Sequence, residues 1–209
     1  MPSIDPRLAV EIEPPPEIDP PHFGAEDDGR IVSSADFAAA TYAPPWIYER
    51  VAGRLVVMSP EGKDHVRSST PWLNRLVPYA VAHPDRVQAV VPSPWVRIDA
   101  DTERIGDIGV YLGGLLDDLN LPDQVPDLIF EFVSPSKEDR RRDYIHKRAD
   151  YLKVGIREYV IVDRFDRKVT VLTRDGDRYA ERVIPSTGTY DSPLLPGFVL
   201  PLSTVWWPK

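Results

Sequence analysis

A glutamate lies in the middle of the most apolar section of PDLIFEFVSPS, residues 126–136. The aromatic and branched side chains of this stretch predict a β-strand, which the Ser-Pro pair ends. Because strand side chains alternate between two faces, Glu131 shares one face with Ile129 and Val133, and Phe130 points to the other. A buried carboxylate without a partner would be costly. The strand therefore has to lie beside a group that pairs with Glu131, either an arginine or the members of a polar site.

A second carboxylate, Asp107, lies in the stretch IGDIGVYL at residues 105–112, which predicts another strand. If the two strands are neighbours with matching faces, Asp107 and Glu131 converge. Two close carboxylates repel each other, and one takes up a proton unless a cation lies between them. Mg²⁺ suits such an all-oxygen site and usually keeps several waters. The alternative for Asp107 is to cap a turn between Gly106 and Gly109.

The segment from Lys137 to Val154 predicts a helix that Gly155 ends. Two stripes of this helix could face the sheet. One contains Ile145, Ala149 and Leu152, and Lys147 lies nearly opposite to it. The other contains Tyr144, Tyr151 and Val154, and Lys147 lies within about 60° of all three. Only the second orientation brings the ammonium group of Lys147 to the carboxylate pair, and the sequence leaves both open.

Positive charge gathers in the same part of the chain. Residues 137–157 contain eight basic and four acidic residues, a local charge of +4 in a chain with a net charge of −8. A basic surface beside a carboxylate site is typical of proteins that bind a polyanion such as nucleic acid. Arg140 and Arg141 are the candidate substrate-binding residues of this segment, although such a run can also be a solvated surface.

The first 30 residues differ from the rest of the chain. They contain seven prolines, eight acidic residues and two arginines, and thereby carry −6 of the net charge of −8. Since they show no helical or strand period, they predict an acidic, proline-rich, disordered arm at residues 1–30 before a domain at residues 31–209. The chain has no cysteine, no signal-peptide pattern at its start and no apolar run of the ~18 residues that a membrane helix needs. We expect a cytoplasmic protein with no membrane partner.

The remaining patterns predict an α/β domain built on one mixed sheet that helices flank. A short helix is expected at residues 34–41 with Ser34 as its cap, and a second helix at 63–82, where Pro71 and Pro78 would kink or divide it. Residues 88–91 and 95–98 are expected to form one strand or a bent pair of strands, and a further strand is expected at 158–163. Two hairpins are expected, one at 46–51 and 54–58 and a C-terminal one at 168–173 and 178–184. We expect Trp206 and Trp207 to pack on the domain.

The ordered motifs resemble a known family. PDLIFEFVSPS, followed by Asp143, Lys147, Tyr151 and the segment GIREYVIVD at 155–163, is similar to the Uma2-type putative restriction endonucleases (domain of unknown function 820). These proteins belong to the PD-(D/E)XK nuclease superfamily. The likeness covers about residues 34–205 and includes further motifs upstream, which are Tyr48-Glu49, Gly53-Arg54-Leu55, Met58-Ser59-Pro60, His65 and Gly106-Asp107-Ile108.

The resemblance implies a restriction-endonuclease-like fold and a phosphodiesterase that depends on Mg²⁺, with Mn²⁺ as a possible substitute. Asp107 and Glu131 match the metal-binding carboxylates of the family. The superfamily lysine usually lies two residues after the glutamate, where this chain has Val133, and the family offers a helix lysine that matches Lys147. This match favours the second helix orientation. Glu49 and His65 match accessory polar positions. Gly106 stands where the family commonly has proline, and Val160 where tryptophan is usual.

Three functions are compatible with these residues. The first is a metal-dependent endonuclease that acts on nucleic acid, in particular DNA, with a homodimer providing two sites. The second is a catalytically inactive nuclease fold that serves as a nucleic-acid-binding or protein-interaction module. The third is a metal-dependent hydrolase of smaller phosphate esters. Cleavage assays that compare the wild type with Glu131→Ala distinguish the first two, and substrate competition distinguishes the third.

Overall fold

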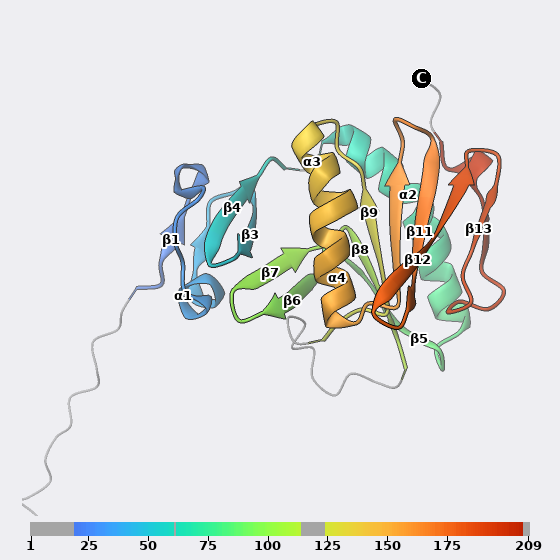
Figure 1. The fold of residues 1–209 in the computed structure, drawn as a ribbon, viewed down its shortest axis with the longest axis horizontal. Helices are drawn as coiled ribbons and strands as arrows, with labels where there is room; N and C mark the ends of the chain where they lie inside the picture. The colour runs from blue at the N-terminus through green and yellow to red at the C-terminus, as the bar shows by residue number, and fades with distance from the viewer. Residues whose placement is uncertain (1–18, 61, 114–123, 207–209) are drawn as a thin grey trace, which may run out of the picture.

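The computed structural model describes residues 19–60, 62–113 and 124–206, and its largest element is a six-stranded mixed sheet (Figure 1). Strand β9 lies inside this sheet, parallel to β10 and antiparallel to β8. The β11–β12 pair forms the predicted C-terminal hairpin. The sheet order is β12 (Arg178–Pro185), β11 (Lys168–Asp175), β10 (Glu158–Asp163), β9 (Leu128–Phe132), β8 (Ile108–Leu112) and β5 (Val87–Pro92).

One face of this sheet packs against helix α2 (Lys63–Ala82) and the C-terminal segments. Leu128, Phe130 and Phe132 of β9 all point to this side, as the period of two predicts. The residue of α2 at the centre of the contact is Trp72, which is fully buried and 5.4 Å from Phe130 between ring centroids. The C-terminal segments are β13 (Thr189–Asp191), β14 (Val199–Pro201) and the 3-10 helix Leu202–Thr204. Helix α2 runs as one helix with both prolines inside it.

The other face of the sheet packs against a helical segment with three parts, which are α3 (Lys137–Arg141), a π-helical turn (Arg142–Lys147) and α4 (Arg148–Val154). Ser136 caps the start of α3 by accepting a hydrogen bond from Asp139 N at 2.9 Å. Gly155 ends α4, as predicted. Its φ of 94° lies in the left-handed region, which glycine adopts without steric cost. This segment lies across β9 and carries the candidate lysine.

A second, four-stranded antiparallel sheet corrects two predictions. It has the order β4-β3-β7-β6 and contains β3 (Ile47–Val51), β4 (Arg54–Met58), β6 (Trp95–Asp99) and β7 (Thr102–Ile105). The prediction of a single sheet was therefore wrong. The prediction of one strand over residues 105–112 was also wrong, because β7 ends at Ile105 in this sheet and β8 begins at Ile108 in the other. Asp107 lies in the link between the two sheets.

A smaller hydrophobic cluster supports the outer side of the second sheet. Helix α1 (Ser34–Ala39) buries Phe37 there, and its cap is Ser33 rather than Ser34. Strand β1 (His22–Phe23) pairs with β2 (Thr41–Tyr42), and a 3-10 turn follows at Ala25–Asp27. Residues 22–27 thus have regular structure within the range predicted as an arm, because Phe23 is buried in this cluster. Residues 1–18 lie outside the described residues.

The C-terminal Trp206 packs against the main hydrophobic core and donates a hydrogen bond to the carbonyl of Ser186 at 3.1 Å. The predicted packing of Trp206 is therefore confirmed, whereas Trp207 lies outside the described residues. None of the helices in the described part of the chain combines the length and the apolar character that a membrane crossing requires.

Candidate active site

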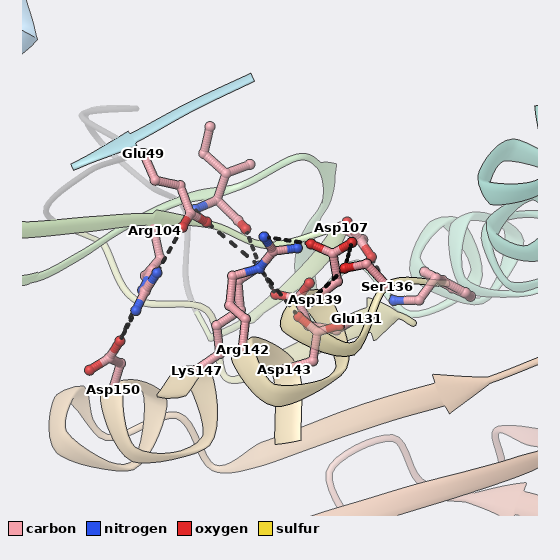
Figure 2. Close-up of polar contacts among 12 residues, drawn as sticks. Glu49, Arg104, Asp107, Glu131, Ser136, Asp139, Arg142, Asp143, Lys147 and Asp150 are labelled. Carbon is pink, nitrogen blue, oxygen red and sulfur yellow. Dashed lines mark hydrogen bonds and ion pairs between the residues drawn. The ribbon is translucent and has the colours of Figure 1, made fainter. Parts of the chain in front are cut away.

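The antiparallel register of β8 and β9 brings the two candidate carboxylates to the same place. Ile108 pairs with Phe130, and the N–H of Asp107 donates to the Phe130 carbonyl at 3.2 Å. One further step in this register puts Asp107 opposite Glu131, and Figure 2 shows their carboxylates side by side. The Oδ2 atom of Asp107 accepts a hydrogen bond from Phe132 N at 2.6 Å. Burial and the nearby Glu131 raise the pKa of Asp107 well above its usual value.

Glu131 is buried in the contact between β9 and the helical segment. Its Oε1 atom accepts hydrogen bonds from Lys147 Nζ at 2.9 Å and from the hydroxyl of Tyr151 at 2.7 Å. Both donors come from the helix, four residues apart, so that one helix face presents them together. The carboxylate in the apolar strand is thus paired with an ammonium group rather than an arginine.

Lys147 has the second of the two predicted orientations. Its Nζ atom also donates to the Ile105 carbonyl at 2.8 Å and lies 3.6 Å from Glu49 Oε1. Ile145, on the alternative stripe, is exposed. Burial alone would lower the pKa of Lys147, but Glu131 and Glu49 more than offset this effect and raise it above its usual value. Lys147 therefore remains a cation inside the protein.

Glu49, a predicted accessory residue, comes from β3 in the second sheet and has no exposed surface (0%). Its carboxylate accepts hydrogen bonds from Ile105 N at 3.0 Å and from Arg104 Nη1 at 2.9 Å. Arg104 continues the chain of contacts to Asp150 of α4, with an Nη2 to Oδ2 distance of 2.8 Å. Although burial would raise the pKa of Glu49, Lys147 and Arg104 hold it below its usual value. This chain of ion pairs connects the second sheet to the helix that carries Lys147.

Of the other predicted site residues, one lies near the carboxylate pair and two lie away from it. His65, in the first turn of α2, places its Nε2 atom 3.7 Å from Asp107 Oδ1, so it lines the site. Arg140 instead pairs with Asp163 at 2.6 Å and with Asp166 at 3.0 Å, which fixes α3 to the end of β10. The side chain of Arg141 is exposed. The structure thus brings His65 to the carboxylate pair and engages Arg140 elsewhere.

Two residues of the π-helical turn reach the site without having been predicted. Asp143 is buried, and its Oδ1 atom has no hydrogen-bond partner in the part of the chain that the structure describes. Burial and Glu131 raise the pKa of Asp143 to about 7, although Lys147 opposes the shift. Arg142 lies between Asp143 and Asp139 (Figure 2). The spacing of four between Asp143 and Lys147 was the sequence signal for Asp143, whereas a regular helix pattern gives no such signal for Arg142.

The residues present fit a hard divalent cation. The donor set consists of carboxylate oxygens, and adjacent carboxylates at Asp107 and Glu131 favour a cation between them. The Asp107 side chain keeps 18% of its surface exposed, so the pair can be reached from solvent. Within residues 19–60, 62–113 and 124–206, no group of three or more His, Asp or Glu side chains forms a complete metal cage. Mg²⁺ suits this arrangement, because proteins commonly bind it through one or two carboxylates and leave other positions to water and phosphate.

Comparisons with known proteins agree with this fold. The sequence model of the Uma2 family, whose description is putative restriction endonuclease, matches residues 35–203. Among solved structures, a putative nuclease belonging to DUF820 from Anabaena variabilis is similar, with a TM-score of 0.66 and 14% sequence identity over 84% of this chain and 97% of that chain. No curated protein matches. At this identity the structural likeness establishes the fold alone, and it confirms the predicted restriction-endonuclease-like α/β class.

Proposed function

The chain belongs to the Uma2 family of putative restriction endonucleases, as its motifs predicted, and from this premise we propose that it is a metal-dependent endonuclease. The proposed reaction is hydrolysis of phosphodiester bonds in nucleic acid. The observation that carries the proposal is the register of β8 and β9, which sets Asp107 beside Glu131. The ion pair between Glu131 and Lys147 at 2.9 Å adds the third member of the site.

In this proposal, Asp107 and Glu131 hold a Mg²⁺ or Mn²⁺ ion. Such an ion supplies charge neutralisation at the phosphate oxygens and a bound water of lowered pKa. Lys147 orients the Glu131 carboxylate through its hydrogen bond to Oε1. Its positive charge, fixed by the Ile105 carbonyl, also stabilises negative charge that develops nearby in the transition state. His65 lies close enough to Asp107 to influence its orientation.

We propose DNA as the substrate. The charge of +4 in residues 137–157 supports a polyanionic substrate, since phosphate contacts dominate the affinity of proteins for nucleic acid. A nuclease that cuts both strands often presents two sites, which a homodimer would provide. Cleavage assays therefore include single-stranded DNA, duplex DNA and RNA of the same sequence.

The test combines cleavage with metal binding. Wild type, Asp107→Asn, Glu131→Gln and Lys147→Gln are incubated with labelled nucleic acid in Mg²⁺, Mn²⁺ or Ca²⁺, and Mn²⁺ affinity is measured by calorimetry. The control is Asp175→Asn, which removes an exposed carboxylate from the β11–β12 turn. We expect both carboxylate variants to lose cleavage and Mn²⁺ affinity together. Lys147→Gln should lose roughly 10²- to 10³-fold in turnover, the cost of removing one preorganised donor, and still bind Mn²⁺.

Two results would contradict the proposal. One is Mn²⁺ affinity in Glu131→Gln equal to that of the control, which would remove Glu131 from the metal site. The other is binding of nucleic acid without cleavage in any of the metals, which would favour the non-catalytic module. Cleavage of a small phosphodiester but not of nucleic acid would instead identify a hydrolase of smaller esters.

A further inference from the structure

Three consecutive arginines at the start of the helical segment have three different environments. Arg140 is engaged by the carboxylates of Asp163 and Asp166, and Arg141 is exposed. Arg142 instead contacts Asp139 and Asp143, the second of which is buried at the site, and it keeps 22% of its side-chain surface exposed. A guanidinium group that is partly buried at a site and still open to solvent can meet a substrate that enters from outside.

The π-helical turn explains why Arg142 faces the site. In an α-helix, residues four apart lie on one face, so Asp143 would lie above Lys147 and Arg142 would point away. The structure has a π-helix over Arg142–Lys147, in which the hydrogen bonds join residues five apart. The wider turn brings Arg142 to the same side as Lys147 while Asp143 stays there as well. Figure 2 shows Arg142 beside Asp139 and Asp143, next to the ion pair between Lys147 and Glu131. Single π-turns inside helices occur frequently at functional sites.

The contacts of Arg142 leave part of its hydrogen-bonding capacity unused. Its Nη1 atom lies 2.9 Å from Asp139 Oδ1, and its Nε atom lies 3.7 Å from Asp143 Oδ1. The Nε atom is buried and has no hydrogen-bond acceptor among the described residues. A guanidinium group has five N–H donors in a planar fork, and the contact with Asp139 uses only one edge of it. Arginine binds phosphate oxygens through such a fork, often in a bidentate way.

We infer that Arg142 is the substrate-binding arginine of this site and that its guanidinium group contacts a phosphate oxygen of the nucleic acid next to Asp107 and Glu131. This inference rests on the proposed function and assigns the substrate contact to Arg142 rather than to Arg140 or Arg141. A purely structural role would consist of neutralising Asp139 and Asp143. A lysine at position 142 can fulfil the structural role, because its ammonium group restores the positive charge. It cannot reproduce the phosphate contact, because it lacks the planar fork of the guanidinium group.

The experiment compares Arg142→Gln and Arg142→Lys with Arg178→Gln. Arg178 is a matched control, since it forms the same type of ion pair with an aspartate three residues earlier, at 3.0 Å, on the exposed β11–β12 turn. The affinity of a fluorescent DNA oligonucleotide is measured in Ca²⁺ and without metal over a range of salt concentrations. Mn²⁺ affinity is measured by calorimetry without DNA, and thermal unfolding shows whether each variant folds.

For Arg142→Gln we expect roughly tenfold weaker DNA binding and a salt-dependence slope smaller by about one, as for the loss of one phosphate contact. Mn²⁺ should bind several-fold more tightly, because one positive charge near the metal site is gone. Arg142→Lys should keep wild-type Mn²⁺ affinity and still bind DNA more weakly. The control should match the wild type in both measurements, within about twofold.

Each outcome supports or overturns the inference. DNA affinity in Arg142→Gln equal to that of Arg178→Gln would overturn it, as would full recovery of DNA binding in Arg142→Lys. If Arg142→Gln does not fold, the DNA affinity of Arg142→Lys alone distinguishes the two roles. If the wild type binds DNA through Arg142 and cleaves nothing, the phosphate contact stands and the nuclease proposal fails. If the wild type does not bind DNA, the inference is wrong.

Discussion

The buried ion pair between Glu49 and Arg104 provides the strongest prediction about stability. Glu49 has no exposed surface, its carboxylate lies 2.9 Å from the guanidinium of Arg104, and both side chains belong to the second sheet. Replacing Glu49 with Gln leaves the buried charge of Arg104 with Asp150 as its remaining carboxylate partner. Removing one partner of a buried pair typically costs about 3–5 kcal/mol. At about 2–4 °C of melting temperature per kcal/mol for a domain of this size, we expect the Glu49→Gln variant to melt roughly 6–20 °C lower.

A double-mutant cycle tests whether this cost comes from the pair itself. Urea unfolding is measured for Glu49→Gln, Arg104→Met and the double variant, and the coupling energy should be about 1–3 kcal/mol. The folded-state pKa of Glu49 is lowered, so its contribution is present above the unfolded value of 4.5 and is lost as the pH falls through the folded value. The difference between wild type and Glu49→Gln should therefore shrink in acid. Additive losses that do not depend on pH would refute the electrostatic explanation.

Two further predictions concern the core and the π-helical turn. Trp72→Ala should lower the free energy of unfolding by about 3–5 kcal/mol, because Trp72 is fully buried against Phe130. The control Val81→Ala, on the exposed side of α2, should change it by less than about 0.5 kcal/mol. Equal losses of the two variants in urea unfolding would contradict this packing. Asp143 has a folded-state pKa of about 7 against 3.8 unfolded, so its protonated form stabilises the fold and this contribution is lost as the pH rises through about 7. Asp143→Asn should therefore gain stability relative to wild type as the pH rises from about 5 to about 8.5. If urea unfolding gives the same free-energy difference between the two proteins over that range, Asp143 does not titrate as described.

Local patterns predicted the parts of the fold that local chemistry determines. The alternation in residues 128–133 indicated the two faces of β9, and the structure puts Phe130 in one core and Ile129 in the other. The Asp175-Gly176 turn and the left-handed Gly155 also lie where their backbone preferences indicated. In each case the determining interactions involve residues close together in the chain, so the sequence pattern contains the necessary information.

The division into two sheets depends on contacts between distant residues. Arg50 of β3 pairs with Glu103 of β7 in register, and its Nε atom donates to that carboxylate at 2.8 Å across 53 residues of sequence. This pairing holds β7 in the second sheet, and the chain then crosses to β8 through Gly106 and Asp107. The sequence pattern over residues 105–112 does not reveal the crossing, since apolar residues stand on both sides of Gly106-Asp107. The candidate metal ligand therefore occupies a link that the sequence presented as the interior of a strand.

In the candidate site, too, local patterns predicted some residues, and others depend on contacts between distant parts of the chain. Asp107 and Glu131 could be predicted because each is a charge in an apolar stretch, whereas Arg104 could not, since its partners Glu49 and Asp150 are 55 and 46 residues away. Periodicity alone left the orientation of Lys147 open, because the helix has two apolar stripes, and only the family resemblance favoured one of them. Tertiary contacts resolve the ambiguity, as the hydroxyl of Tyr151 reaches Glu131 and thereby fixes which stripe faces the sheet.

The position of Val133 is compatible with the role proposed for Lys147, in which a helix lysine replaces the strand lysine that the resemblance implies at position 133. Val133 shares the Glu131 face of the strand and is buried in the core under α4, so a lysine there would project into the space between sheet and helix. Lys147 enters the same space from the opposite side and brings its Nζ atom to 2.9 Å from Glu131. The chemical requirement is an ammonium group at that carboxylate, and either element can meet it. An apolar residue at 133 keeps the strand compatible with the core, while Glu49, 3.6 Å from Nζ, offsets part of the cost of burying the lysine on the helix.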